Sequence, residues 1–318
     1  MDCTLPPCPI TGRPAKRRVH GVAASVLARM WRLAGAGDVS RLLPTSGQVV
    51  LYESDTGLYF FHPRTAGDDA FYTRFYTAHR AHSLLSARPH GRVEYQYAVR
   101  HIPPGALVLD VGCGNGELGG HLPHCTYRGL DPYAGPGASP AVRRESLEQH
   151  LTLARGTYDV VTAFQVIEHV VDPRAFAAQL VELLKPGGTL ILGAPLHPSP
   201  LTEIPNLLLN APPHHLTWWN CGAFAALAAE LGLTSVEITE VAYSAHEAII
   251  FWMRRFTLVR PGRGRDERYF AHRWSWHLNL ILSYLLGRMA NRLFPPPASG
   301  RPCNVILVAR KPDRAAVP

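Results

Sequence analysis

The chain has few cysteines, few lysines and no long hydrophobic run. Its six cysteines are scattered along 318 residues, a spacing that excludes a disulfide framework and suits a reducing compartment. No apolar segment follows the first residues, so we expect neither a signal peptide nor a membrane anchor and predict a cytoplasmic location. With 47% hydrophobic and 18% charged residues, the sequence is that of a folded chain long enough to bury a full core.

The net charge of +8 comes almost entirely from arginine, because lysine occurs only at positions 16, 185 and 311. A nucleic-acid-binding surface needs basic residues interleaved with aromatic rings, and the nearest segment is 254–273 with Tyr269, Phe270 and the adjoining Trp274. Arginines spread over many segments are more typical of a solvated face. The sequence therefore does not favour nucleic acid as a partner.

A glycine-rich turn at 107–117 is the most informative stretch of the chain. Residues 107–111 form a short apolar run typical of a buried parallel strand, and Asp110, Gly112, Gly114 and Gly116 stand at every second position. A dinucleotide-binding fingerprint, G-x-G-x-x-G, would place its last glycine where this chain has Glu117. An acid at the strand end also favours a cationic or amine-bearing ligand over a pyrophosphate, which it would repel.

A second strand is predicted at 126–130, and it ends in Asp131 and Pro132. An α/β nucleoside-binding fold places a carboxylate for the ribose hydroxyls about 20 residues after the first strand end, a spacing that Asp131 satisfies relative to Asp110. The other interpretation is an Asp-Pro turn without a ligand. Tyr133 follows, and it either lies against an adenine ring or shields the turn.

These motifs closely resemble those of the class I S-adenosylmethionine (SAM) methyltransferases, whose first motif is D-x-G-x-G-x-G; the L-K-P-G-G stretch at 184–188 is a further resemblance. The resemblance implies that the three glycines pass beneath the methionine part of SAM, while Asp110 orders the loop and its bound water or amine. Further cofactor contacts are implied after the next strands, at Asp131, Pro132, Tyr133, Ser146, Leu147 and Gln165. Within the superfamily, the chain is most similar to the bacterial branch that contains ubiquinone-pathway O-methyltransferases and methyltransferases of natural-product or glycan pathways.

Alternating strands and helices predict an α/β fold with a doubly wound, mostly parallel seven-stranded sheet and a ligand beyond the carboxyl ends of its strands. The remaining strands are expected at 141–145, 158–164, 189–194, 234–241 and 304–309, with helices at 173–184 and 221–231. We divide the chain into an N-terminal accessory region (1–100), a SAM-binding core (101–242), a helical insertion before the last strand (243–300), and the last strand with its tail (301–318).

The accessory region carries two turns, at 8–12 and 53–57, that resemble zinc knuckles from which most cysteines have been lost. We therefore expect the shape of a zinc ribbon without its metal, including a hairpin over 49–61. Helices are predicted at 68–86 and 92–100. Aromatic side chains on the first helix more often fill a core, but the resemblance places this segment over the SAM site, which makes Phe71 and Tyr72 candidate cofactor contacts.

Methyl transfer from a sulfonium is an in-line displacement, so alignment in a dry site is the protein's main task. A hydroxyl acceptor must also lose its proton, and a positioned base typically adds ~10² to 10⁴ in rate. His214 and His215, on a proline-stiffened loop after the fifth strand, are the predicted catalytic residues. His215 is the preferred base and His197 a weaker alternative. No acid or cysteine lies close to the histidine pair in the sequence, so no metal site is predicted.

The segment 165–170 resembles the family's motif after the fourth strand. Its adjacent Glu168 and His169 are expected to point in different directions, and His169 is more typical of a packed, hydrogen-bonded histidine than of a catalytic one. The predicted function is thus SAM-dependent O-methylation of a small molecule or glycan. N- or C-methylation of a natural product and a catalytically silent SAM-binding partner subunit are the alternatives.

The insertion contains an amphipathic pattern from Trp274 to Phe294. Its apolar stripe consists of Trp274, Leu278, Ile281, Leu285 and Met289, and its flanking arginines are Arg268, Arg273, Arg288 and Arg292. Polar residues interrupt the segment, which excludes a membrane span. It is either a helix packed over the substrate cleft or at a homodimer contact, or a surface through which 268–294 touches an anionic membrane.

Overall fold

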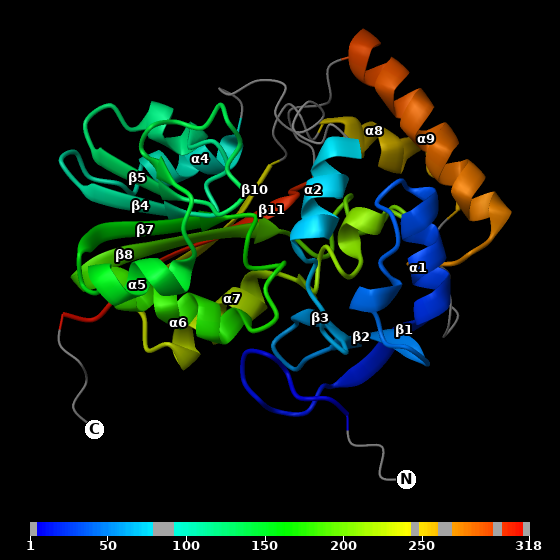
Figure 1. Cartoon of the computed structure of the whole chain (residues 1–318), viewed down its shortest axis with the longest axis horizontal. Coiled ribbons are helices and arrows are strands. Elements are labelled where there is room, and N and C mark those ends of the chain that lie inside the picture. The colour runs from blue at the N-terminus through cyan, green and yellow to red at the C-terminus, as the bar shows by residue number, and fades with distance from the viewer. Residues whose placement is uncertain (1–4, 79–91, 243–247, 260–268, 295–300, 314–318) are drawn as a thin grey trace.

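The computed structural model describes residues 5–78, 92–242, 248–259, 269–294 and 301–313, and these residues form two β-sheets (Figure 1). The larger sheet has seven strands in the order β10-β11-β8-β7-β4-β5-β6, and the smaller has four in the order β1-β2-β3-β9. The larger sheet corresponds to the predicted core. The smaller sheet combines the accessory region with a strand from the core sequence.

Five strands of the large sheet are paired in parallel, and the first two strands in the order above are joined to it by antiparallel pairings. The parallel strands are β4 (Leu107–Val111), β5 (Thr126–Leu130), β6 (Val142–Arg143), β7 (Tyr158–Phe164) and β8 (Leu184–Pro195). The antiparallel pairings are made by β10 (Thr234–Val241) and β11 (Asn304–Arg310). The predicted doubly wound, mostly parallel α/β sheet is confirmed. The L-K-P-G-G stretch forms the irregular start of β8, where the pairing with β7 shifts register.

Helices cover both faces of this sheet, as Figure 1 shows. On one face lie α5 (Leu147–Ala154), α6 (Pro173–Leu183) and α7 (Cys221–Glu230), and on the other lies α4 (Val93–Val99). Strand side chains alternate between the faces, so that Leu109 and Val161 pack with the first group while Val108 and Val160 pack with α4. A short 3-10 helix, η2 (Glu117–His121), follows the glycine turn.

The accessory region contributes β1 (Arg17–Ala23), α1 (Ala24–Leu33), η1 (Ser40–Leu42), β2 (Gln48–Glu53), β3 (Tyr59–His62) and α2 (Asp69–Ala78). The predicted hairpin is confirmed as the antiparallel pair β2 and β3. The helix expected at 68–86 is present as α2, and its predicted second half lies outside the described residues. The two knuckle-like turns are joined by an ion pair between Arg13 and Asp55 at 2.8 Å.

The strand β9 (Thr217–Trp218) closes the small sheet by pairing with β3. It follows a loop that contains η3 (Leu208–Asn210) and the two predicted catalytic histidines. The insertion contributes α8 (Ala248–Phe256) and α9 (Trp274–Leu293), which pack against each other at the edge of the molecule (Figure 1). Within the described residues, no helix is long and apolar enough to cross a membrane, and none of the five cysteines there forms a disulfide.

Candidate functional site

The glycine turn leaves the carboxyl end of β4 with all three glycines in the left-handed region, at φ values of 70°, 57° and 84° for Gly112, Gly114 and Gly116. A Cβ on Gly112 would lie 2.4 Å from Val166 Cγ2, so a side chain is excluded there by close packing. A Cβ on Gly114 would meet no protein atom within 4 Å. The turn therefore presents bare backbone to open space at Gly114, as a ligand cradle requires.

Asp131 connects this turn to the end of the neighbouring strand β5. Its Oδ2 accepts a hydrogen bond from the Gly114 amide at 2.8 Å, and its Oδ1 accepts one from the Tyr133 amide at 2.8 Å. Pro132, which stands between Asp131 and Tyr133 in the sequence, is exposed. The structure thus brings the predicted methionine-binding turn and the predicted ribose carboxylate together at one edge of the sheet.

Asp110 lies beneath the turn rather than at its surface. Its carboxylate is buried and accepts hydrogen bonds from the hydroxyls of Thr162, at 2.7 Å, and Tyr127, at 3.0 Å. Burial raises the pKa of Asp110 to about 6, although these two hydrogen bonds act to lower it. The side chain is thereby fixed to β5 and β7, which holds the strand end that leads into the glycine turn.

Three further predicted cofactor residues have structural partners of their own. Ser146 caps α5, with its hydroxyl accepting from the Gln149 amide at 3.3 Å, and the neighbouring Leu147 is buried in the core. Gln165, at the end of β7, has a left-handed φ of 59° and donates to the Glu94 carboxylate at 2.6 Å. A non-glycine residue held in this region costs about 1 to 3 kcal/mol and is typical of functional sites. Contacts of these residues with a cofactor stay predictions.

The predicted base residues His214 and His215 meet His169, which follows β7, in one cluster of three imidazoles. The ring centroid of His169 lies 4.5 Å from that of His214 and 4.7 Å from that of His215. Backbone carbonyls orient two of the rings, because His169 Nδ1 lies 2.8 Å from the His214 oxygen and His214 Nδ1 lies 3.0 Å from the Leu209 oxygen.

The imidazoles of His169 and His215 are neutral at physiological pH. Burial lowers the pKa of His169 to about 4, although its hydrogen bond to a backbone carbonyl acts to raise it. The pKa of His215 is lowered well below its ordinary value, first by burial and then by the two neighbouring histidines. A neutral imidazole is able to accept a proton or to ligate a metal ion.

Glu168 is the residue that sequence reasoning placed wrongly. It was expected to point away from His169, but its Oε1 lies 3.7 Å from His169 Nε2 and 4.0 Å from His215 Nε2. The carboxyl group is buried, and neither oxygen has a hydrogen-bond partner within the described residues. Burial raises its pKa to about 8. A buried carboxyl group without hydrogen bonds is unusual and points to a role in the site.

This cluster has the donor atoms of a metal site. The ligand nitrogens of His169, His214 and His215 all lie within 4.8 Å of one another, and the Glu168 carboxylate lies beside two of them, 3.7 Å from His169 and 4.0 Å from His215. Imidazole with carboxylate suits Zn²⁺ and similar divalent ions, and backbone carbonyls at Nδ1 are typical outer partners of metal-binding histidines. The absence of a metal stays a prediction, but the reason for it, the lack of a nearby acid, is wrong.

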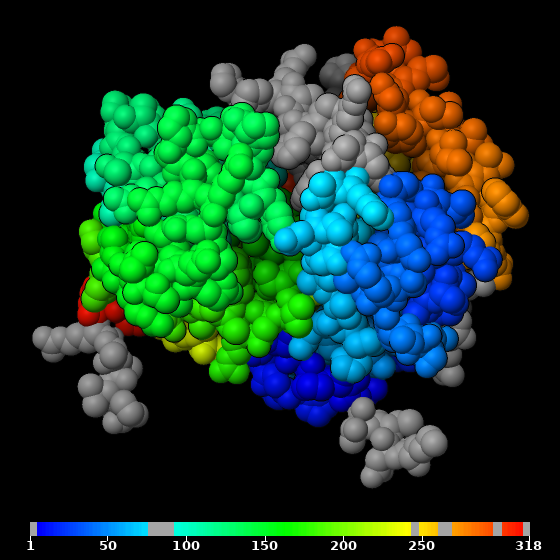
Figure 2. Space-filling view, in the orientation of Figure 1, coloured from blue at the N-terminus to red at the C-terminus, as the bar shows by residue number. Residues whose placement is uncertain are grey.

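Aromatic rings from α2 lie between the two halves of the site. The Tyr72 ring is 5.9 Å from Tyr133, which follows the predicted ribose carboxylate, and 6.2 Å from both His169 and His214. Tyr133 is further tied to α2 by its hydroxyl, which donates to Asp69 at 2.7 Å. Figure 2 shows the surface hollowed between α2, in cyan, and the green core.

Phe71 has a different environment from Tyr72. Its ring is buried in the accessory core, 5.3 Å from Trp31 and 5.8 Å from Phe75. Phe71 therefore fills a core, the first of its two interpretations, and supports Tyr72 from behind. Its contact with a cofactor stays a prediction.

Backbone hydrogen bonds hold the histidine loop between the two sheets. The Phe61 amide of β3 donates to the Leu216 oxygen at 2.9 Å, and the Leu216 amide donates to the Glu168 oxygen at 2.7 Å. The accessory hairpin, the histidine loop and the turn after β7 are thus bonded in sequence. The accessory region builds part of the site rather than forming a separate layer.

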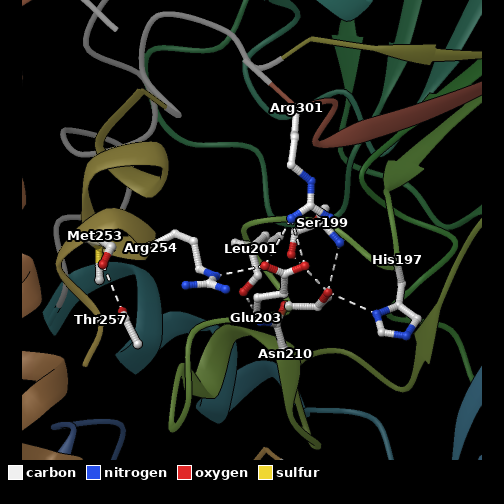
Figure 3. A network of polar contacts seen from close by, with 10 residues as sticks. His197, Ser199, Leu201, Glu203, Asn210, Met253, Arg254, Thr257 and Arg301 are labelled. Carbon is white, nitrogen blue, oxygen red and sulfur yellow. Dashed lines mark hydrogen bonds and ion pairs between the residues drawn. The ribbon is translucent and has the colours of Figure 1, made fainter. Parts of the chain in front are cut away.

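His197, the weaker base candidate, lies outside the histidine cluster. It is buried against the rings of Tyr59 and Trp218, and its Nδ1 lies 2.9 Å from the Thr202 hydroxyl. Burial lowers its pKa to about 4. The adjoining network ties this loop to the insertion, because Glu203 bonds Arg254 at 2.7 Å and Arg301 at 2.8 Å (Figure 3). This environment favours a structural role for His197.

A known protein family matches the middle of the chain, and known proteins are similar to parts of it. The family model described as "Methyltransferase domain" matches residues 77–238. A ubiquinone biosynthesis O-methyltransferase of Cronobacter sakazakii is 36% identical over 97 residues, which are 26% of this chain and 40% of that protein. The protein of the same description from Xanthomonas campestris is 33% identical over 136 residues, or 39% of this chain and 56% of that protein. The chain thus spans about half the length of the curated relatives that it matches.

Among solved structures, a SAM-dependent methyltransferase from Archaeoglobus fulgidus is 16% identical, with a TM-score of 0.44 over 74% of this chain and 99% of that one. The family model covers half of the chain and contains the glycine turn, Asp131 and the turn after β7. The chain therefore belongs to the methyltransferase domain family, within the class I SAM-dependent methyltransferase superfamily.

Proposed function

We propose that this protein transfers the methyl group of SAM to a hydroxyl oxygen of a small molecule or glycan, and that His215 receives the proton of that hydroxyl. One observation carries the proposal: the Tyr72 ring touches both Tyr133, beside the ribose carboxylate, and the histidine cluster. A cofactor above the glycine turn and an acceptor at the histidines would therefore be neighbours. The names of the relatives, which are O-methyltransferases, support oxygen as the methylated atom.

The cofactor half follows from the glycine turn. The open space at Gly114 accommodates the methionine part of SAM, and Asp131 is placed to accept hydrogen bonds from the ribose hydroxyls. When bound, SAM supplies an electrophilic methyl group on a sulfonium. The chain's own task is to align that group with the acceptor and to keep water out.

The acceptor half has to remove one proton. His215 makes no hydrogen bond to another described residue through its ring, so the ring is available to an acceptor hydroxyl. Its lowered pKa makes it a weak base in isolation. Burial raises the pKa of Glu168 to about 8, and once ionised this carboxylate, with its Oε1 4.0 Å away, would stabilise the imidazolium that forms when the proton arrives. We therefore infer that Glu168 assists the base by stabilising the protonated form of His215.

A second candidate mechanism uses the same cluster with a divalent ion. The specific observation in its favour is the set of three converging histidines beside a carboxyl group that makes no hydrogen bond to the described residues. In that case His169, His214, His215 and Glu168 would hold the ion, and the ion would acidify the acceptor hydroxyl.

The test is turnover with labelled SAM across a panel of phenols, sugar hydroxyls and amines, using the full chain. We expect methylated hydroxyl products from the native protein, while His215→Ala loses turnover but keeps SAM affinity. His197→Ala is the matched control and should retain activity. Loss of activity in EDTA, with recovery on adding Zn²⁺ or Mg²⁺, would favour the mechanism with a divalent ion over the one in which His215 is the base.

Two further outcomes decide the alternatives. If the products were methylated on nitrogen or carbon, with no O-methylated product, the protein would be an N- or C-methyltransferase and not an O-methyltransferase. Calorimetric binding of SAM without turnover on any acceptor would favour a SAM-binding partner subunit.

A further inference from the structure

The helix α9 has its polarity reversed relative to a helix on the surface of a water-soluble protein. Its buried face consists mainly of small or polar residues: Trp276, Asn279, Ser283, Gly287 and Ala290. Its exposed face carries large apolar side chains: Trp274, Leu278, Ile281, Leu282, Leu285, Leu286, Met289 and Leu293. Surface helices normally present the opposite arrangement. The outer face of α9 is therefore built to contact something other than water.

The orientation of α9 is fixed by its inner face. A Cβ on Gly287 would lie 3.1 Å from Met253 Cγ, so this glycine allows α9 to pack closely on α8. Asn279 Oδ1 accepts hydrogen bonds from the amides of Leu258 and Val259 at 2.8 and 3.2 Å. Rotation of the helix to bury its apolar side would break both contacts. The exposed face is a consequence of specific packing.

The apolar face extends over neighbouring residues at the rim of the molecule. Trp274 is 86% exposed at the start of α9, and Leu258, whose amide bonds to Asn279, is 87% exposed. Figure 2 shows α9, in orange, along the outer edge, where it is open to a large partner. A 20-residue helix is about 30 Å long, which is long enough for extended contact with a flat surface.

The charge of this region has one sign. The sequence contains no aspartate or glutamate between Tyr269 and Arg310. Arg273, Arg288 and Arg292 are exposed beside the apolar residues. The surface is thus both apolar and basic, which complements a partner that offers hydrocarbon and negative charge together.

We propose that α9 lies flat on an anionic lipid surface, with its apolar face in the headgroup boundary and its arginines on lipid phosphates. The helix does not cross the membrane, since no described helix is apolar enough to do so. A second copy of the chain is disfavoured as the occupant, because a two-fold contact through α9 would bring arginines together without any acid to pair them. This proposal is independent of the chemistry proposed above.

The experiment is co-sedimentation of the full chain with vesicles of phosphatidylcholine alone and of phosphatidylcholine with phosphatidylglycerol. We expect binding to the anionic vesicles about tenfold or more above that to the neutral ones, and weaker binding as salt is raised. The double variant Leu278→Gln/Leu285→Gln should lose about tenfold or more of this binding. Leu153→Gln is the matched control, because Leu153 is an 83% exposed leucine on α5, and should bind as the native chain does.

Three results would overturn the proposal. The first is no binding to either kind of vesicle, with circular dichroism indicating a folded chain. The second is equal loss of binding in the double variant and in the Leu153 control. The third is a dimer in size-exclusion chromatography that the double variant converts to a monomer without any vesicle binding, which would assign α9 to a homodimer contact.

Discussion

The indole of Trp31 donates a hydrogen bond of 2.7 Å to the backbone oxygen of Pro212, 181 residues further along the chain. Trp31 belongs to α1 and is fully buried in the accessory core. Pro212 stands two residues before His214 in the histidine loop. The accessory region thus helps to determine where the catalytic candidates lie, through a contact that touches none of them.

We expect Trp31→Phe to lower kcat strongly while SAM affinity stays close to native. The Pro212 oxygen would lose its donor in a buried place, at a cost of about 1 to 3 kcal/mol, and the loop could relax. Initial rates with labelled SAM, with calorimetry for binding, measure the two effects separately. Trp276→Phe, a buried tryptophan in α9, is the control. Equal losses of kcat in both variants would argue against a positioning role for Trp31.

Gly114→Ala should weaken SAM binding by about tenfold or more, because the new methyl group would occupy the open space above the turn. Gly105→Ala is a closely matched control. Its φ of 82° is also left-handed, its Cβ would also meet nothing within 4 Å, and it precedes the opposite end of β4. Each alanine should cost about 1 to 2 kcal/mol of stability. Native SAM affinity in Gly114→Ala would remove the turn from the cofactor site.

Asp131→Ala should weaken SAM binding by about 1 to 3 kcal/mol, the usual loss for a charged hydrogen-bond partner. Asp159→Ala provides the comparison, because Asp159 also accepts from a backbone amide, that of Leu107 at 2.8 Å, but near the amino end of β7. Calorimetric titration of both variants with SAM checks the expectation. If the two variants bound SAM equally well, the ribose assignment of Asp131 would be wrong.

Glu168 should make the protein less stable as pH rises. Its pKa is about 8 in the folded chain because of burial, above its ordinary value of 4.5, so the native state retains a proton that the unfolded state releases. Its stabilising contribution is complete below the unfolded pKa and is lost as pH rises through about 8. Glu168→Gln has no such proton, so its stability should fall less over this range.

Urea unfolding of both proteins from about pH 5 to about pH 8.5, in the presence of a chelator, measures this difference. Glu148→Gln, which replaces an exposed glutamate, should follow the native curve. Parallel curves for native and Glu168→Gln would contradict the raised pKa.

The fold of the core could be predicted because each strand carries a local signal. The apolar runs of β4 and β7 and the alternation of β10 need no distant partner to be recognised, and the Asp172-Pro173 pair marks the start of α6. The glycine turn and Asp131 were also found from spacing alone, since both depend on short segments next to strand ends.

The composition of the histidine cluster depends on contacts between distant segments. His169 follows β7, and His215 lies in the loop after β8. These two strands are parallel neighbours, so their carboxyl ends share one edge of the sheet. The order of the strands would therefore have been enough to predict that these histidines lie close together. The position of Glu168 beside them depends instead on the hydrogen bond from the Leu216 amide to the Glu168 backbone oxygen. The elements β1 and α1 were not predicted at all, because their partners lie in β2 and in the histidine loop.

The pairing of β3 with β9 has a consequence for biosynthesis. The Asn220 side chain bonds the Gly57 oxygen across 163 residues, and β9 is the last strand of the small sheet to be translated. Until the ribosome has released residues 217 and 218, the nascent chain carries β3 as an open sheet edge, which invites pairing with other chains. C-terminal truncations that end before β9 should therefore aggregate in cells, even though every residue of the hairpin is present.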